Sequence, residues 1–273
     1  MSVSPFTPTV LKEIIKEYNL DYTSEDLLAL YSFTGGVAKY VQLLIDAGAT
    51  TKTKMLNQIV RADSIFIGEG KAILIEEFGK DYGIYFSILS AIARGRTSRS
   101  EIESIVGKEI GGYLTKLENE YELITKKQPI FENSSTKNVR YTIEDNFFTF
   151  WFRFIYKYNY MIEIENYEAL KTIINRDYET FSGLMLERYF KRVLIESKEY
   201  TNIGSWWDRK GENEIDIVAE NELDGKAVFI EVKRKPENFD PIALNDKVAA
   251  FCRATGKFKD YTVSHQCLSM VDM

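Results

Sequence analysis

The sequence contains very little histidine, cysteine and proline: one, two and five of these residues occur among 273. A histidine-rich zinc site or a Ser-His-Asp triad would need histidines that this chain lacks. The cysteines, Cys252 and Cys267, have neither metal-binding nor redox spacing. No run approaches the ~18 consecutive apolar residues of a membrane span, and the first ten residues do not resemble a signal peptide. These absences predict a cytoplasmic protein with reduced thiols.

The chain also has no excess of positive charge. Its formal net charge is −6, so nothing in the total directs it towards nucleic acid. The same value does not exclude a nuclease, because enzymes that cleave phosphodiesters use carboxylates to bind metal ions. A hydrophobic content of 45% allows large cores, and the length is sufficient for two domains. Overall composition therefore does not distinguish a nuclease from other functions, and the pattern of residues along the chain has to do so.

Residues 1–70 have the pattern of a small helical bundle. Apolar residues recur at helical spacing over residues 10–20, and Ser24 is a candidate N-cap for a second helix that ends at Gly35 and Gly36. Two further helices are predicted over residues 37–48 and 51–62. This bundle by itself indicates no function.

Residues 71–145 have the element order of a winged helix. Helices are predicted at 81–95, 98–107 and 111–124, the second beginning with a capping box of Ser98 and Glu101. Two short β runs follow, at 123–130 and 138–145. Two interpretations stay open, one of contacts with DNA phosphates and one of packing against protein. Contacts with DNA are favoured by the basic residues Arg94, Arg96, Arg99, Lys126 and Lys127. Packing against protein is favoured by the acidic residues of the third helix, Glu118, Glu120 and Glu122.

Aromatic residues occupy most of the stretch from Phe147 to Tyr160. Such a segment is either a buried helix that joins the winged helix to the following segment or a surface on which bases stack. Its few charges, Arg153 and Lys157, favour the buried helix.

The remainder of the 146–273 segment changes to an α/β pattern. A helix containing Glu187 is predicted at 180–197, then three strands, a helix at 240–256 and a last short strand. Strict alternation along strands 213–220 and 226–235 places Asp216 and Val218 on one face, together with Glu231 and Lys233. Ile215 and Ile217 then belong to the opposite face. Asp224 and Gly225 supply turn chemistry for the hairpin between these strands.

A cluster of two carboxylates and an ammonium suits metal-assisted hydrolysis of phosphodiesters. Asp216, Glu231 and the backbone carbonyl of Val232 are hard oxygen ligands for Mg²⁺, and Mn²⁺ is an alternative. Lys233 is then the group that orients the nucleophile or stabilises charge in the transition state. The alternative is a hairpin with one solvated face on which opposite charges pair across strands. Phe229 and Val218 on the same face argue against a simply wet surface.

The order of helix, three strands, helix and strand, with Asp216, Glu231 and Lys233, resembles the restriction-endonuclease-like PD-(D/E)XK superfamily. The resemblance implies a nuclease-like fold in which Asp216 and Glu231 bind metal and Lys233 is catalytic. It implies a further metal ligand at Glu187, the acid of the first helix. Lys247 occupies the place of a second-helix basic residue, and with Lys235 it is a candidate contact for nucleic acid. The proline of the superfamily motif is replaced by Ile215.

The stretch 31–44, the winged helix and the stretch 141–158 follow one another in an order that resembles the C-terminal part of a prokaryotic ATPase family of the AAA+/STAND type. No Gly-Lys pair is followed by Ser or Thr, so the phosphate-binding loop is missing. We therefore expect no ATP hydrolysis by this chain, which would be a truncated form or the downstream product of a split ATPase. ATP becomes a cofactor only if an ATPase domain is supplied. Two hypotheses remain: a Mg²⁺-dependent nuclease, acting alone or activated by an ATPase, and a non-catalytic module that binds DNA or protein.

Overall fold

The computed structural model describes residues 4–133 and 135–273. Within them the chain has a mixed α and β architecture, with many helices, a two-stranded antiparallel sheet and a four-stranded mixed sheet. The described residues form two compact units. Unit 1 comprises residues 4–6, 10–127 and 140–179, and unit 2 comprises residues 7–9, 128–133, 135–139 and 180–273. Among these residues, no helix combines the length and the apolar character that crossing a membrane requires.

Helices make up most of residues 8–81. They are α1 (Pro8–Tyr18), α2 (Ser24–Thr34), α3 (Ala38–Asp46), α4 (Lys52–Ile59), α5 (Ile65–Phe78) and the short 3₁₀ helix η1 (Gly79–Asp81). Gly35 ends α2 in the left-handed conformation, at φ +61°, as predicted. Ser24 is not the N-cap of α2. Thr23 has that place, because its hydroxyl accepts the Asp26 N–H at 3.2 Å and the Asp26 carboxylate accepts the Thr23 N–H at 3.0 Å.

Helix α5 was not expected from the sequence, since Gly68 and Gly70 interrupt its pattern. The two glycines have different surroundings. A Cβ atom at Gly70 would lie 2.6 Å from the Trp151 ring, whereas nothing lies within 4 Å of one built at Gly68. Gly70 therefore permits the indole to approach the backbone of α5, and the indole N–H donates to the Ile67 carbonyl at 3.1 Å.

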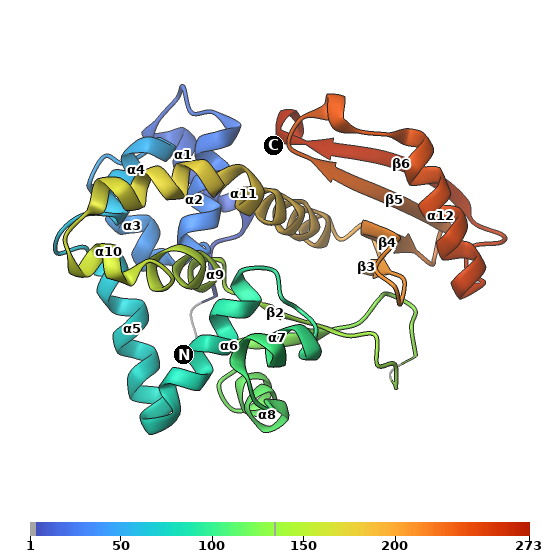
Figure 1. Cartoon of the computed structure of the whole chain (residues 1–273). Coiled ribbons are helices and arrows are strands. Elements are labelled where there is room, and N and C mark those ends of the chain that lie inside the picture. Colours follow the sequence, from blue (N-terminus) through green and yellow to red (C-terminus); the bar gives the residue numbers. More distant parts are fainter. Residues whose placement is uncertain (1–3, 134) are drawn as a thin grey trace. The chain divides into compact units, whose positions relative to one another are not determined.

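Three helices and a β-hairpin follow in the predicted order (Figure 1, green). They are α6 (Tyr82–Ala93), α7 (Arg99–Val106), α8 (Gly111–Asn119), β1 (Ile124–Lys127) and β2 (Arg140–Ile143). The predicted capping box is present, with the Glu101 carboxylate accepting the Ser98 N–H at 3.0 Å. Strands β1 and β2 pair antiparallel, with Ile124 opposite Ile143. Capping and hydrophobic spacing therefore determine this part of unit 1 locally.

Most of the aromatic segment is buried, as predicted, although Tyr160 near its end is 55% exposed, and the segment is not one regular helix. It consists of α9 (Asn146–Phe150), the π-helix η2 (Trp151–Tyr156) and α10 (Asn159–Glu163). Phe150 packs against Phe33 of α2 at a ring-centroid distance of 4.7 Å, and Phe152 against Phe86 of α6 at 5.4 Å. Burial of these rings fixes the segment in the core of unit 1.

Unit 2 is built on the four-stranded sheet. Helix α11 (Tyr167–Ser197) begins in unit 1, and its residues from Thr180 onwards belong to unit 2. The following elements are β3 (Asn202–Trp207), β4 (Glu214–Asn221), β5 (Lys226–Lys233), η3 (Pro236–Asn238), α12 (Pro241–Thr255), β6 (Thr262–Ser269) and η4 (Met270–Asp272). The strand order is β3-β4-β5-β6, antiparallel except for β6, which pairs parallel to β5. Helix α12 is the crossover that a parallel pair requires.

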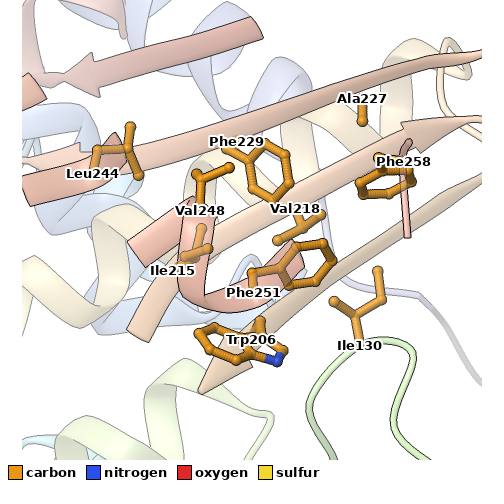
Figure 2. Close-up of a cluster of buried hydrophobic side chains, with 10 residues drawn as sticks. All are labelled: Ile130, Trp206, Ile215, Val218, Ala227, Phe229, Leu244, Val248, Phe251 and Phe258. Atoms are coloured by element: carbon orange, nitrogen blue, oxygen red, sulfur yellow. The ribbon is translucent and has the colours of Figure 1, made fainter. Parts of the chain in front are cut away.

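The core of unit 2 lies between the sheet and α12, as Figure 2 shows. Phe251 of α12 is fully buried and packs edge-on against Trp206 of β3 and Phe229 of β5, at ring-centroid distances of 5.6 and 5.1 Å. Ile130, from the segment between β1 and β2, joins this cluster, and its N–H donates to the Ser205 carbonyl at 2.8 Å. Aromatic burial therefore fixes α12 on one face of the sheet.

A β-bulge interrupts the alternation of β4. Gly204 pairs with Val218 and Trp206 pairs with Ile215, so Asp216 and Ile217 lie opposite the single residue Ser205. Ile215 and Val218 consequently belong to the same buried cluster, where Figure 2 shows them together. The expectation that Ile215 faces away from Val218 is therefore wrong, because strict alternation does not hold across a bulge.

Candidate functional site

Glu231 is the centre of a charge cluster in unit 2. Its side chain is 9% exposed, and its Oε1 lies 2.8 Å from Lys233 Nζ. Lys247 Nζ lies 2.9 Å from Oε1 and 3.1 Å from Oε2. Glu231 and Lys233 are two residues apart on β5 and share a face, while Lys247 comes from α12, which packs on the sheet. One buried carboxylate thus holds two ammonium groups from different elements.

Asp216 lies at the bulge of β4, next to Glu231. Its Oδ2 accepts the backbone N–H of Val232 at 2.8 Å. Burial and the negative charge of Glu231 raise the pKa of Asp216 to about 6, against the opposing effects of the Val232 bond and of Lys233 and Lys247. The preceding turn is organised by another acid: the Asp208 carboxylate accepts the Asn213 backbone N–H at 3.1 Å and the Asn213 amide at 2.7 Å. The turn and the bulge together set the position of Asp216.

Glu187 approaches the cluster from α11. Burial and the charge of Asp216 raise its pKa to about 8, with Glu214 adding to the effect and Lys233 opposing it. At neutral pH this carboxyl therefore holds a proton. Burial works to lower the pKa of Lys233, but its hydrogen bond to Glu231 and the surrounding carboxylates outweigh that effect and raise it. Lys233 therefore stays charged.

The remaining predicted residues lie elsewhere. Lys235 is exposed just beyond the end of β5. Arg94, Arg96 and Arg99 belong to unit 1. Arg96 lies 3.5 Å from a Glu101 carboxylate oxygen, and Arg99 lies 2.7 Å from one of Glu103, so part of their charge is already compensated. The cluster in unit 2 therefore comprises Asp216, Glu231, Lys233 and Lys247, with Glu187 at its margin and Val232 contributing a backbone group.

Sequence reasoning missed one contact beside this cluster. Arg234, which follows Lys233, donates from Nη1 to the Ser182 hydroxyl of α11 at 2.5 Å. Ser182 is fully buried. The bond ties the end of β5 to α11, the helix that carries Glu187. A serine on an apolar helix face was the available signal, but nothing in the sequence identifies its partner.

Three carboxyl groups and two ammonium groups are crowded together in this cluster, and a carboxyl group that is buried next to other carboxylates holds its proton more tightly. The two ammonium groups do not fully neutralise the carboxylates, as the raised pKa values of Asp216 and Glu187 indicate. Over residues 4–133 and 135–273, however, no group of three or more His, Cys, Asp or Glu side chains is arranged to hold a metal ion. As placed, Lys233 and Lys247 occupy the Glu231 oxygens that such an ion would need.

Comparison with known proteins finds that part of this chain is similar to a family of unknown function. Residues 151–249 match the model of the family DUF234, described as archaea bacterial proteins of unknown function. An uncharacterized protein of Methanocaldococcus jannaschii is 33% identical over 238 residues, which cover 81% of this chain and 51% of that protein. The chain thus spans about half the length of the curated relative that it matches. No solved structure matches this chain. The matched region contains the candidate cluster, from Glu187 to Lys247.

Proposed function

We propose that unit 2 hydrolyses phosphodiester bonds in nucleic acid with the help of Mg²⁺. The observation that carries this proposal is the position of Asp216 at a β-bulge beside Glu231, with two ammonium groups at the same carboxylate. Bulges are frequent next to active sites, where they redirect a side chain. The order α11-β3-β4-β5-α12-β6 supports a PD-(D/E)XK-like fold for this unit. The order of α6 to β2 supports a winged helix in unit 1, and α1 to α4 support a lid-like bundle before it.

The donor set fits Mg²⁺ by its chemistry. Asp216 and Glu231 supply hard carboxylate oxygens, and Glu187 is a third carboxyl near them. The two ammonium groups at Glu231, 2.8 to 3.1 Å from its oxygens, show that this position attracts positive charge. They stand in for a divalent cation, and both belong to long side chains that can move away from it. Asp216 and Glu231 would hold the ion, which would polarise a phosphoryl oxygen and acidify a bound water.

In this proposed reaction, the protein's own side chains supply positive charge near the phosphoryl group and a proton for the leaving oxygen. Lys233, released from Glu231, provides an ammonium group that stabilises negative charge on the attacked phosphoryl group. Lys247 supplies a second such charge from α12. Glu187 holds a proton at neutral pH, so it can donate to an oxygen that leaves with negative charge. The Val232 N–H holds Asp216 in place at 2.8 Å. Binding of a divalent ion would lower the raised pKa of Asp216, whereas burial, the main cause of the raised pKa of Glu187, would remain.

Incubation of the full chain with supercoiled plasmid and Mg²⁺ tests the proposal. We expect nicking by the wild type and a loss of about 100-fold or more in Asp216→Asn, because an interaction worth several kcal/mol in the transition state is removed. Glu222→Gln is the matched control, since Glu222 is an exposed acid in the β4–β5 turn of the same sheet. Mg²⁺ should also raise the unfolding temperature of the wild type and of Glu222→Gln, but not of Asp216→Asn. Equal inactivity of the wild type and Asp216→Asn, with no effect of Mg²⁺ on unfolding, contradicts the proposal.

A second function is favoured by one observation, the closed ion-pair network around Glu231. If Lys233 and Lys247 stay on Glu231, the sheet carries a structural charge cluster and the chain acts as a non-catalytic module for an ATPase. This function predicts DNA binding without cleavage, unchanged in Glu231→Gln. A steep loss of affinity with salt would identify phosphate contacts, and absence of DNA binding would point to a protein partner.

A further inference from the structure

Unit 1 contains a small pocket lined mainly by positively charged side chains. Its volume is about 170 Å³, and it is lined by Arg94, Arg153, Phe154, Lys157 and Asp177. A single buried water needs only about 10–15 Å³, so the pocket has room for a group of several non-hydrogen atoms. Three of the five lining side chains are cations from two separate segments, the end of α6 and the π-helix with the residue after it.

The one carboxylate in the pocket is already neutralised. Arg176 Nε lies 2.7 Å from Asp177 Oδ1, and Arg176 Nη2 lies 2.9 Å from Oδ2, so this guanidinium grips both oxygens. The bond to Arg176 lowers the pKa of Asp177, and the nearby charges of Lys157 and Arg153 add to that effect. Asp177 is thus ionised and paired, and a net positive charge from Arg94, Arg153 and Lys157 remains around the cavity.

Capping of a helix accounts for only part of this arrangement. Arg94 Nε donates to the Ser90 carbonyl at 3.1 Å, and Arg153 Nη1 donates to the Ala93 carbonyl at 3.2 Å, both in the last turn of α6. A helix C-terminus carries about half a negative charge, which one cation is sufficient to offset. Three cations converge here, and burial lowers the pKa of Arg153, which shows that holding this charge in unit 1 is costly.

The remaining donors point to the class of ligand. Within the described part of the chain, the terminal nitrogens of Arg94 make no hydrogen bond or ion pair with protein. Lys157 is exposed, and its ammonium lies 4.6 Å from the centre of the Tyr158 ring, a contact that leaves its hydrogen-bond donors available. A guanidinium fork matches the oxygens of phosphate, and three cations exceed what one carboxylate would need. The π-helix that carries Arg153 is a distortion found frequently at functional sites.

We propose that this pocket binds a phosphoryl group, carried either by a small phosphate compound or by the 5′ end of a nucleic acid. Arg94 and Lys157 grip its oxygens from the open side, and Arg153 supplies charge from the half-buried side. The site lies wholly in unit 1 and needs neither Asp216 nor Glu231. It therefore goes beyond the proposed hydrolysis, and it stands whether or not that activity is found.

Calorimetric titration of the full chain with inorganic phosphate tests the site, at constant ionic strength and with chelator present. We expect saturable binding at millimolar or lower concentration. Arg94→Gln and Lys157→Gln should each weaken it about 10-fold to 100-fold, because each removes a charge-assisted bond. Both side chains are exposed, so neither variant should unfold the protein. Lys16→Gln is the matched control: it removes one charge from an exposed position of α1 outside the pocket and should bind as the wild type does.

A second arm of the experiment distinguishes the source of the phosphoryl group. Short oligonucleotides with and without a 5′-phosphate are compared by fluorescence anisotropy. A preference for the phosphorylated end that is lost in Arg94→Gln identifies a nucleic-acid end. Binding of inorganic phosphate with no such preference identifies a small phosphate compound. The proposal is overturned if neither probe binds, or if Arg94→Gln and Lys157→Gln bind both probes as tightly as Lys16→Gln does.

Discussion

Replacement of Glu187 by glutamine should remove most of the pH dependence of stability that this part of unit 2 contributes. Glutamine keeps the shape of the side chain but cannot ionise. In the folded wild type, burial and the charge of Asp216 raise the Glu187 pKa from 4.5 to about 8. The neutral form is therefore favoured by folding. The stability it contributes is fully present below pH 4.5 and is lost as the pH rises through about 8.

The size of the effect follows from the displacement of the pKa. One pKa unit corresponds to 1.36 kcal/mol, so a rise from 4.5 to about 8 sets an upper limit of about 5 kcal/mol. Glu187 is half-buried, and solvent reduces the realised value, so we expect about 2–5 kcal/mol. The free energy of unfolding of Glu187→Gln, relative to the wild type, should rise by that amount between about pH 5 and about pH 9.

Urea unfolding followed by tryptophan fluorescence measures this difference. Trp206 and Trp207 lie in unit 2 and Trp151 in unit 1, so a Trp151→Phe background makes the signal report on unit 2. Chelator keeps divalent ions out of the measurement. Asp216→Asn removes the charge that contributes to the raised Glu187 pKa. In an Asp216→Asn background, the difference in stability caused by Glu187→Gln should therefore develop over a narrower pH range. In a Glu222→Gln background, that difference should be the same as in the wild type. A difference between Glu187→Gln and the wild type that is the same at both pH values refutes the reasoning.

Two further predictions concern packing. Phe251→Ala removes the ring that packs against Trp206 and Phe229, and it should lower the free energy of unfolding of unit 2 by about 3–5 kcal/mol in the same urea assay. An effect below about 1 kcal/mol would contradict the buried position of this ring. Gly70→Ala places a methyl group 2.6 Å from the Trp151 ring and should destabilise unit 1 by about 1–3 kcal/mol in thermal unfolding. Gly68→Ala in the same helix meets no atom within 4 Å and should stabilise it by up to about 1 kcal/mol, so equal effects would contradict this account of α5.

Local signals predicted most of the secondary structure. The capping box of Ser98 and Glu101 and the left-handed Gly35 appear where the sequence placed them, because caps depend on residues within a few positions of each other. Alternation and turn residues likewise gave strands β3 to β6 and helix α12 in the correct order. Helix α5 was missed because Gly70 lowers helix propensity. The reason for that glycine is the indole of Trp151, which is 81 positions away in the chain.

The sequence by itself determined which charged groups belong to the centre of the sheet in unit 2: Asp216, Glu231 and Lys233 are recognisable from their spacing on two neighbouring strands. Only the tertiary structure decided how these groups are arranged. It placed Lys247 on Glu231, brought Glu187 close enough to raise its pKa, and put Asp216 at a bulge that alternation does not predict. Spacing along a strand is set by local backbone geometry. Lys247 reaches Glu231 only when the packing of Phe251 and its neighbours fixes α12 on the sheet.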